Sequence, residues 1–487
     1  MAREPLLALL TDTGALGVRE RIYRTCLDAI LTGALKPGQR MASARRLAAD
    51  WRVARNTVDD ALAQLHVEGW IVRRVGDGTR VAATLPRARR PRAVPPRAPS
   101  VFGRAALREP SLWGRATRGD HDPASVPRAI AFGAGMADLD AFPLAAWRRL
   151  AARRARVDGV RALAYPPALG HPALREALAQ HLRASRGLGC APDQVMICNS
   201  AMQAIELVVR VLLERGDAAL IEDPGYPNLR AVIGTAGVRP VPVPLDESGM
   251  DVARGVERCA RPALIVVTPA CQYPTGVPMT LARRLEVLRV AEACGAWIVE
   301  DDHQSEFVHR GRAIAPLARL DGTRTILVGT FSHVVFPSLR LAWCVLPAAL
   351  VDVFEAVRRQ LDDHTHAPLQ GVLADFIDGG HFAAHLRRMR ALYAERRDAF
   401  ERACTRALPP FARLGRLDAG MTAALHLPTR ISDRAIATRA LAQGLVAVPL
   451  ARYALEARIN GLLLGYAALD ERRIAGGVTA LARVLRA

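Results

Sequence analysis

The sequence predicts two folded regions of different class, an α+β region at the N-terminus and a larger α/β region, joined by a linker. Helical periodicity followed by two short β-branched runs indicates the first region, over residues 1–85. A stretch rich in proline and arginine and free of acidic residues opens the linker, residues 86–128. Strand-like runs that alternate with helical stretches predict a mainly parallel sheet in residues 129–487, with a smaller α+β subdomain from about residue 360.

Length and composition narrow the class of protein. A chain of 487 residues can bury two or three full cores. No apolar run approaches the ~18–20 residues that span a bilayer, so we expect no membrane partner. Eight cysteines without a CxxC pair are typical of reduced thiols in the cytoplasm. The formal net charge of +20 favours a polyanionic partner such as DNA.

The N-terminal region contains the elements of a helix-turn-helix with a β-wing. Helical segments are predicted at residues 16–34, 43–51 and 54–68, with Ser43 as the cap of the second, and strands at residues 70–72 and 79–81. The third helix has the shape that fits the major groove of double-stranded DNA, and the hairpin can reach a flanking backbone. A basic helical domain for protein contacts is the alternative.

Five apolar runs predict the strands of the larger region. They are residues 194–198, 218–222, 263–269, 296–302 and 325–329. Their continuous apolar character indicates strands that are buried on both faces of a parallel sheet. Ligands bind at the carboxyl ends of such strands, and several polar residues follow these runs directly.

Residues 329–343, GTFSHVVFPSLRLAW, follow the last of these runs. This stretch resembles the cofactor-lysine segment of fold-type I pyridoxal-phosphate aminotransferases. More narrowly, it resembles the form GTFSK…FPSLRLG of MocR-type regulators, which join a GntR-like winged helix-turn-helix to an aminotransferase-like domain. In that family the lysine forms an imine with the cofactor. Here the position holds His333, which cannot form an imine, and the only lysine in the sequence is Lys36.

The N-terminal region resembles the GntR winged helix along its whole length, in the motifs LKPGQR, ARRLA, RNTV, QLxxEGW and GDGTRVA. The resemblance implies DNA contacts from Arg45, Arg55, Asn56, Thr57, Arg73, Arg74 and Thr79. Asp59 and Asp60 depart from it, because they place negative charge early in the recognition helix, where phosphates repel it. These carboxylates could cap backbone amides or accept from the amino groups of cytosine.

The aminotransferase resemblance covers nearly all of the larger region, including the loop TPACQYPTG at residues 268–276, and implies a cofactor site at its strand ends. The positions for the cofactor phosphate are Asn199, Ser200, Ala201, Ser332, Arg340 and, from the partner subunit, Tyr165. The positions for the cofactor ring are Tyr226, which stacks on it, Asp301, which pairs with the pyridine nitrogen, and His303, which replaces a tyrosine. Leu463 aligns where working aminotransferases carry an arginine for the substrate carboxylate.

Together these observations predict a cytoplasmic DNA-binding regulator of MocR type, a head-to-tail homodimer that does not transaminate. Its effector would be pyridoxal 5′-phosphate or an amino-acid-related ligand, held noncovalently, and an empty, decayed pocket is the alternative. A rival prediction is a fold-type I enzyme, dependent on pyridoxal or pyridoxamine phosphate, in which His333 is the catalytic base with a pKa near neutral. We expect no metal site.

Overall fold

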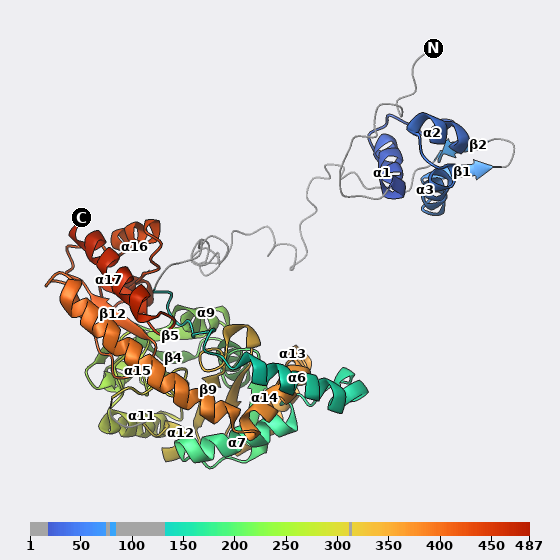
Figure 1. Cartoon of the computed structure of the whole chain (residues 1–487). Helices are drawn as coiled ribbons and strands as arrows, with labels where there is room; N and C mark the ends of the chain where they lie inside the picture. Colours follow the sequence, from blue (N-terminus) through green and yellow to red (C-terminus); the bar gives the residue numbers. More distant parts are fainter. Residues whose placement is uncertain (1–17, 75–77, 84–131, 311–313) are drawn as a thin grey trace. The chain divides into compact units, whose positions relative to one another are not determined.

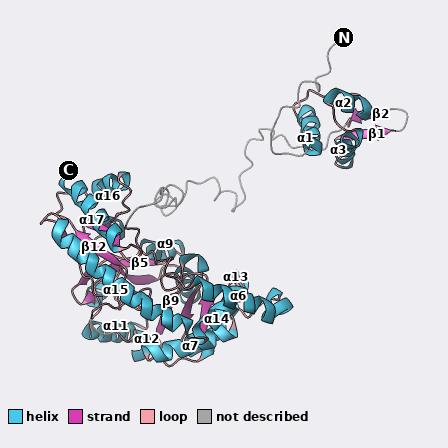
Figure 2. Cartoon of the chain, in the orientation of Figure 1, coloured by secondary structure: helices cyan, strands magenta, loops and turns pink. Residues whose placement is uncertain are grey.

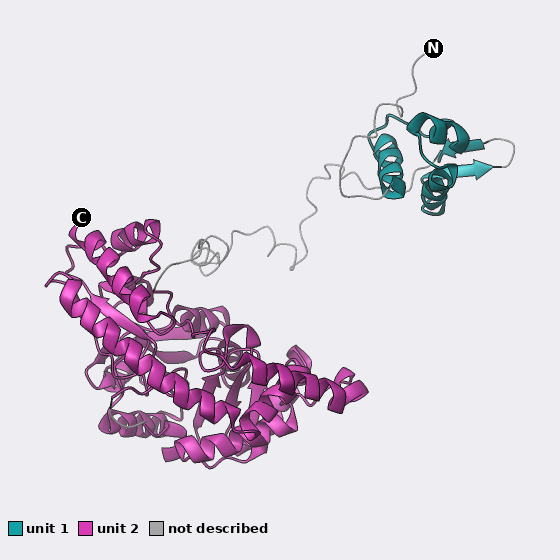
Figure 3. Ribbon diagram, in the orientation of Figure 1, with its two compact units in different colours: residues 1–111 teal, residues 112–487 magenta. Residues whose placement is uncertain are grey.

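The computed structural model of the chain describes residues 18–74, 78–83, 132–310 and 314–487. They belong to two compact units, within residues 1–111 and 112–487 (Figure 1, Figure 3). The predicted linker, residues 86–128, lies outside the described residues, and so does the boundary predicted at residue 129.

The first unit contains the three predicted helices and the predicted strand pair. Its elements are α1 Val18–Leu31, α2 Ala44–Trp51, α3 Arg55–Val67, β1 Ile71–Arg74 and β2 Gly78–Val81. Apolar side chains of all five elements share one core, in which Leu62 is fully buried. Ser43 caps α2, as predicted, by accepting a hydrogen bond of 3.3 Å from a first-turn amide. The strands pair antiparallel with Ile71 opposite Val81.

The second unit is built on an eight-stranded sheet with the order β3-β10-β9-β8-β7-β4-β5-β6. Figure 2 shows strands of the unit in magenta and its helices in cyan. The strands are β3 Val195–Cys198, β4 Ala218–Asp223, β5 Arg239–Asp246, β6 Gly249–Met250, β7 Leu264–Val267, β8 Trp297–Asp301, β9 Thr325–Thr330 and β10 Ala342–Val345. The five predicted strands are all present, and four of them, β4, β7, β8 and β9, lie side by side and parallel. The mainly parallel sheet is thereby confirmed, with β10 antiparallel to both of its neighbours.

Strand β5 is missing from the sequence prediction because Pro240, Pro242 and Pro244 interrupt its pattern, and proline cannot donate to a sheet ladder. The amide of Arg239 donates to the carbonyl of Asp217, on the β4 side. Because backbone nitrogens along a strand alternate in direction, the nitrogens of Pro240, Pro242 and Pro244 face away from β4. On that other side, only the last two residues of β5 pair with β6. In this register the prolines remove no hydrogen bond between β5 and β4.

Helices cover both faces of the sheet. They are α6 Leu144–Asp158, α7 Pro172–Arg186, α8 Ala201–Leu212, α9 Pro227–Thr235, α10 Val252–Arg258, α11 Leu281–Cys294, α12 Leu317–Leu320, α13 Val351–Leu361, α14 Ala367–Asp378 and α15 His381–Ala407. Neighbouring strand residues point to opposite faces. Accordingly, Leu327 and Trp343 join the core that contains α7, α14 and α15, whereas Val328 and Cys344 join the core that contains α8.

A small antiparallel sheet closes the chain, with the order β11-β12-β14-β13. Its strands are β11 Arg413–Leu414, β12 Thr422–His426, β13 Val448–Pro449 and β14 Gly461–Gly465, and its helices are α16 Asp433–Ala442 and α17 Glu471–Arg486. The long helix α15 runs from the large sheet to α17 and packs along α17 (Figure 1). Of the helices that the structure describes, none combines the length and the apolar character that a bilayer crossing requires.

A buried arginine ties the β3–α8 connection to α13. Arg358 is 0% exposed. Its guanidinium donates to the Ile197 carbonyl at 2.8 Å, to Thr365 Oγ1 at 2.6 Å and to Asp362 Oδ1 at 2.6 Å. The other oxygen of Asp362 accepts from the side-chain amide of Gln203 at 2.5 Å. Each nitrogen of this guanidinium has a hydrogen-bond partner, so its positive charge is stable in the interior. Replacing Arg358 would leave several buried groups without this partner.

We predict that Arg358→Ala lowers the free energy of unfolding of the second unit by about 3 kcal/mol, because it removes the donor to Asp362 Oδ1 and the shorter of the two donors to the Ile197 carbonyl. Arg359→Ala, at the next residue, removes only an exposed pair with Glu355 and should cost about 0.5 kcal/mol or less. Urea unfolding followed by far-UV circular dichroism measures both. Equal losses in the two variants would contradict the role given to Arg358.

Candidate functional site

Several predicted site residues meet at the carboxyl ends of the central strands. Asp301 ends β8, and His333 lies three residues beyond the end of β9. The His303 and His333 rings lie 6.3 Å apart, centroid to centroid, and His303 Nδ1 is 3.8 Å from Asp301 Oδ1. The Tyr273 ring lies 5.8 Å from His303 and 6.0 Å from Tyr226. The structure therefore brings together Asp301, His303, His333 and Tyr226 from three separate segments.

Asp301 is a mostly buried carboxyl group that lacks a full set of partners. Its Oδ1 atom accepts no hydrogen bond from any residue that the structure describes. Burial, and then the negative charge of Asp302, raise the pKa of Asp301 to about 7. An unpaired acceptor in such a place is costly unless a donor arrives from outside the chain. The site is thus suited to a ligand that presents a cationic or polarised N–H group.

The imidazole of His333 is held in one tautomer. Its Nδ1 atom donates to the Gly135 carbonyl at 3.0 Å, so the proton lies on Nδ1 and Nε2 carries the lone pair. Burial, and then the neighbouring His303, lower the pKa of His333 to about 4. The pKa near neutral expected for a catalytic base is therefore wrong. The physical reason is that burial removes water from the imidazolium, while none of the carboxylates that the structure describes forms an ion pair with it.

The start of α8 supplies backbone donors to the site. Ser200 caps the helix by accepting from the Gln203 amide at 3.1 Å, and the Asn199 amide donates to the Gln203 side chain at 2.7 Å. The Asn199 amide is thus committed within the chain, while the first amides of α8, from Ala201 onward, have no intrahelical acceptor. Such amides and the positive end of the helix favour an anion.

Three further residues are predicted to hold phosphate, and they do not all belong to this site. Arg340 is exposed, and no carboxylate of the described residues forms an ion pair with it. The Ser332 amide donates to Thr330 Oγ1 at 3.1 Å. Tyr165 is 86% exposed, with its ring 5.8 Å from His364, and makes none of the contacts described above. Within one chain, therefore, the structure does not bring Tyr165 into this site.

An apolar wall borders the site, and the sequence reveals only part of it. Leu463 is fully buried in a cluster with Tyr453, against which Tyr273 and Ala134 also pack. The hydroxyls of Tyr273 and Tyr453 lie 3.2 Å apart. Tyr273 belongs to a loop that the resemblance marks, TPACQYPTG, whereas no periodicity or motif marks Tyr453. The wall therefore offers ring surface and hydroxyl groups in place of the aligned arginine.

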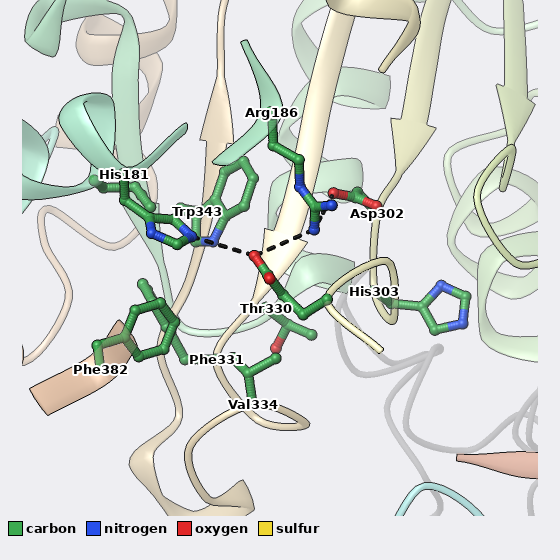
Figure 4. A pocket seen from close by; sticks show the side chains of 11 residues that line it. His181, Arg186, Asp302, His303, Thr330, Phe331, Val334, Trp343 and Phe382 are labelled. Carbon is green, nitrogen blue, oxygen red and sulfur yellow. Dashed lines mark hydrogen bonds and ion pairs between the residues drawn. The ribbon is translucent and has the colours of Figure 1, made fainter. Parts of the chain in front are cut away.

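A charged cluster that sequence reasoning missed anchors the segment after β8 (Figure 4). Arg186 lies 3.2 Å from Glu306 and 3.5 Å from Asp302, and His181 lies 3.2 Å from Glu306. Burial alone would raise the pKa of Glu306, but the hydrogen bond from His181 and the charges of Arg186 and Arg390 lower it to about 2. The cavity among these side chains, about 20 Å³, has room for one water molecule.

The predicted DNA-binding face lies on α2, α3 and the wing of the first unit. Arg45, Arg55, Asn56, Arg73 and Arg74 are exposed, and Thr57 is half-buried. Thr79 is only 9% exposed, so its side chain does not fit the predicted contact with DNA. The other predicted residues are accessible to a ligand.

Comparisons with known proteins agree with both units. Residues 18–81 match the gntR family of bacterial regulatory proteins, and residues 128–461 match the class I and II aminotransferases. The chain is 38% identical to a probable rhizopine catabolism regulatory protein MocR of Rhizobium meliloti, over 95% of this chain and 93% of that protein. It is 33% identical to the HTH-type transcriptional regulator TauR of Rhodobacter capsulatus, over 98% of both. The chain belongs to the MocR-type transcriptional regulators.

The aminotransferase-like unit of this MocR-type protein also has solved relatives. The crystal structure of LysN, an alpha-aminoadipate aminotransferase from Thermus thermophilus, superimposes with a TM-score of 0.70 and 30% identity, over 79% of this chain and 97% of that one. The predicted combination of a winged helix-turn-helix and a fold-type I aminotransferase-like domain is thereby confirmed.

The family implies pyridoxal phosphate in the MocR-type fold, and most of the described site suits that molecule. The unpartnered Asp301 oxygen suits a protonated pyridine nitrogen. The amides at the start of α8 and the unpaired guanidinium of Arg340 suit a phosphate. Covalent attachment is the part that does not fit, because no lysine is present in the second unit.

Stability should depend on pH through Asp301. Its pKa is 3.8 when the chain is unfolded and about 7 in the fold, so the unfolded state binds fewer protons between these values and stability falls as the pH rises through them. Asp301→Asn cannot ionise. We expect this variant to be more stable than the wild type at pH 8, by about 1–3 kcal/mol, and nearly equal to it at pH 4.

Urea unfolding at the two pH values measures this difference. Asp302→Asn is the matched control, because it removes an ion pair with Arg186 and should lower stability at pH 8. A loss of stability in Asp301→Asn at pH 8 would contradict the description of Asp301 as an unpaired carboxyl.

Proposed function

We propose that this protein is a DNA-binding transcriptional regulator whose aminotransferase-like unit binds an effector without transaminating it. One observation carries the proposal. The position that follows Ser332 holds a neutral histidine, and Lys36, the only lysine of the sequence, belongs to the first unit. Transamination needs a primary amine on the protein, because only such an amine condenses with the cofactor and is displaced by the substrate. The chain keeps positions that hold a ligand and lacks the group that reacts.

DNA recognition is assigned to the first unit. The recognition helix α3 would lie in the major groove with Asn56 and Thr57 toward the bases. Arg45 on α2, Arg55 at the start of α3 and Arg74 on the wing would meet phosphate. The exposure of these side chains supports the assignment, as does the gntR match. The partner is double-stranded DNA of a promoter.

The effector is assigned to the site at the ends of β8 and β9. Pyridoxal phosphate, held noncovalently, would supply an electron-poor ring, a phosphate and an aldehyde to which an amino-acid-related ligand can add. Asp301 would accept from the ring nitrogen and Tyr226 would stack on the ring. The start of α8, Ser332 and Arg340 would hold the phosphate, with His303 and His333 as neutral neighbours of the ring. A ligand that binds one conformation better than another would then change promoter occupancy.

The rival function, an enzyme with His333 as its base, has less support. A general base works best with a pKa near the working pH, whereas burial lowers the pKa of His333 to about 4. The hydrogen bond from Nδ1 to Gly135 leaves the Nε2 lone pair available in either role. The lowered pKa is therefore the feature that favours a hydrogen-bond acceptor over a base that removes a proton from carbon.

A homodimer is part of the proposal. The end of α6 and the following turn, Gly159–Leu163, present Val157, Val160 and Leu163 to solvent at 63%, 82% and 84% exposure. Contiguous apolar exposure of this kind is typical of a subunit interface. Tyr165 lies two residues beyond Leu163. In a head-to-tail dimer, the Tyr165 ring of each subunit would lie away from the site of its own subunit and toward the site of the partner.

The DNA-binding assignment predicts a specific loss in Arg45→Ala. Arg45 is exposed and makes no ion pair among the described residues. Its removal should weaken binding of the full chain to its own upstream DNA about tenfold and reduce the salt slope, dlogK/dlog[salt], by about 1. Fluorescence anisotropy at several salt concentrations measures both quantities. The matched control is Arg387→Ala, which removes the same charge from an exposed position on α15 and should leave binding unchanged.

If the site holds pyridoxal phosphate noncovalently, a lysine placed at residue 333 should restore covalent attachment. Wild-type protein mixed with pyridoxal phosphate and then reduced with borohydride should carry no adduct in the second unit, as peptide mass spectrometry can show. His333→Lys should acquire a yellow absorbance band and an adduct at residue 333, because the rest of the site holds the cofactor in place. The control is His364→Lys, which places a lysine outside the site and should remain unlabelled. An unlabelled His333→Lys would point to a pocket that no longer holds the cofactor.

A further inference from the structure

Asp59, an acidic residue on the recognition helix, pairs with two arginines of the DNA-binding face, Arg55 and Arg73. Asp59 lies in the second turn of α3, where the sequence pattern raised a conflict with phosphate. Its Oδ1 atom accepts from Arg73 of β1 at 2.6 Å, and its Oδ2 atom lies 3.4 Å from Arg55 Nε, one helical turn earlier. The two carboxylate oxygens thus serve two different elements, the recognition helix and the wing.

The neighbouring Asp60 provides a contrast. It is exposed and forms no ion pair with the residues that the structure describes. The pair between Asp59 and Arg73 is also the one described ion pair that joins α3 to the wing. Its location, rather than its strength, is what matters, because exposed pairs contribute little to stability. Two acidic residues of equal charge and adjacent position therefore have different surroundings.

The consequence for DNA binding follows from charge. Each phosphate that a protein neutralises releases counterions and strengthens binding to every sequence alike. A chain with a net charge of +20 is at risk of such indiscriminate binding. Arginines that are already paired with Asp59 have less to gain from a phosphate. Their pairing lowers the sequence-independent part of the affinity.

We propose that Asp59 is a specificity-determining residue, which withholds Arg55 and Arg73 from phosphate unless a base competes for its carboxylate. The base chemistry that fits is the amino group of cytosine, which donates to Asp and Glu in the major groove. On a site with cytosine facing α3, the carboxylate turns to the base and the two arginines become available to the backbone. On other sequences they stay paired. This inference rests on the proposed DNA-binding function.

The test compares two DNA duplexes with the full chain. One duplex is recovered from a random-sequence pool by repeated selection with the wild type, and the other has the same composition in scrambled order. We expect Asp59→Asn to bind the scrambled duplex about tenfold more tightly and to increase the magnitude of its salt slope by 1 to 2, about one unit for each arginine released. The ratio of the two affinities should fall in the same proportion.

Two matched variants separate this mechanism from a change of net charge. Asp60→Asn adds the same charge at the next residue and should leave the salt slope and the affinity ratio as in the wild type. Asp59→Asn combined with Arg73→Gln should lose about half of the increase in slope. The inference is overturned if Asp59→Asn leaves the slope unchanged or if Asp60→Asn has the same effect. If the wild type recovers no preferred sequence from the pool, the proposed function fails, and the inference fails with it.

Discussion

The unpaired carboxyl of Asp301 is the constraint on which the ligand site depends. A fold does not retain a buried acceptor without a donor unless something compensates for its desolvation. Here part of the compensation is proton uptake, since burial and Asp302 raise the pKa of Asp301 to about 7. The histidines around it contribute no positive charge, because burial lowers the pKa of both His303 and His333. Among the described residues, no cationic donor forms a hydrogen bond with Asp301 Oδ1, so a ligand with a cationic or polarised N–H group would suit the site.

Two networks hold this costly arrangement in place, one on each side of the sheet. On the α8 side, Arg358 and Asp362 reach Gln203, whose side-chain oxygen in turn accepts from the Asn199 amide. On the α7 side, Glu306 joins Arg186, His181 and Arg390, and so fixes the segment that follows Asp301. In each network the charged side chains pair with one another, whereas Asp301 Oδ1, in the site between them, has no hydrogen-bond partner among the described residues.

The sequence was sufficient for the features that depend on local pattern. Continuous apolar runs predicted five strands, because a parallel sheet buries both faces, and the cap at Ser43 predicted the start of α2. Features that depend on pairing over long distances could not be predicted in this way. The prolines of β5 obscure its strand pattern, and only its pairing with β4 and β6 shows that they remove no hydrogen bond to β4. Glu306 pairs with residues of α7 and α15, which are far from it in the chain. Tyr453 becomes part of the site only because the small sheet packs Leu463 behind it.

The segment after β8 is also where an effector can be coupled to the rest of the unit. Beyond His303, the side-chain oxygen of Gln304 accepts from the Met421 amide at 3.1 Å, and His309 Nε2 donates to the Gly420 carbonyl at 2.7 Å. Glu306 binds Arg390 of α15, which packs along α17. A ligand in contact with His303 would therefore act on a segment whose other contacts lie in the C-terminal part of the chain. Because packed interfaces adopt discrete arrangements rather than deforming continuously, a small displacement at His303 would favour one arrangement of that part over another. The proposed effector sensing requires a connection of this kind between the ligand and the rest of the unit.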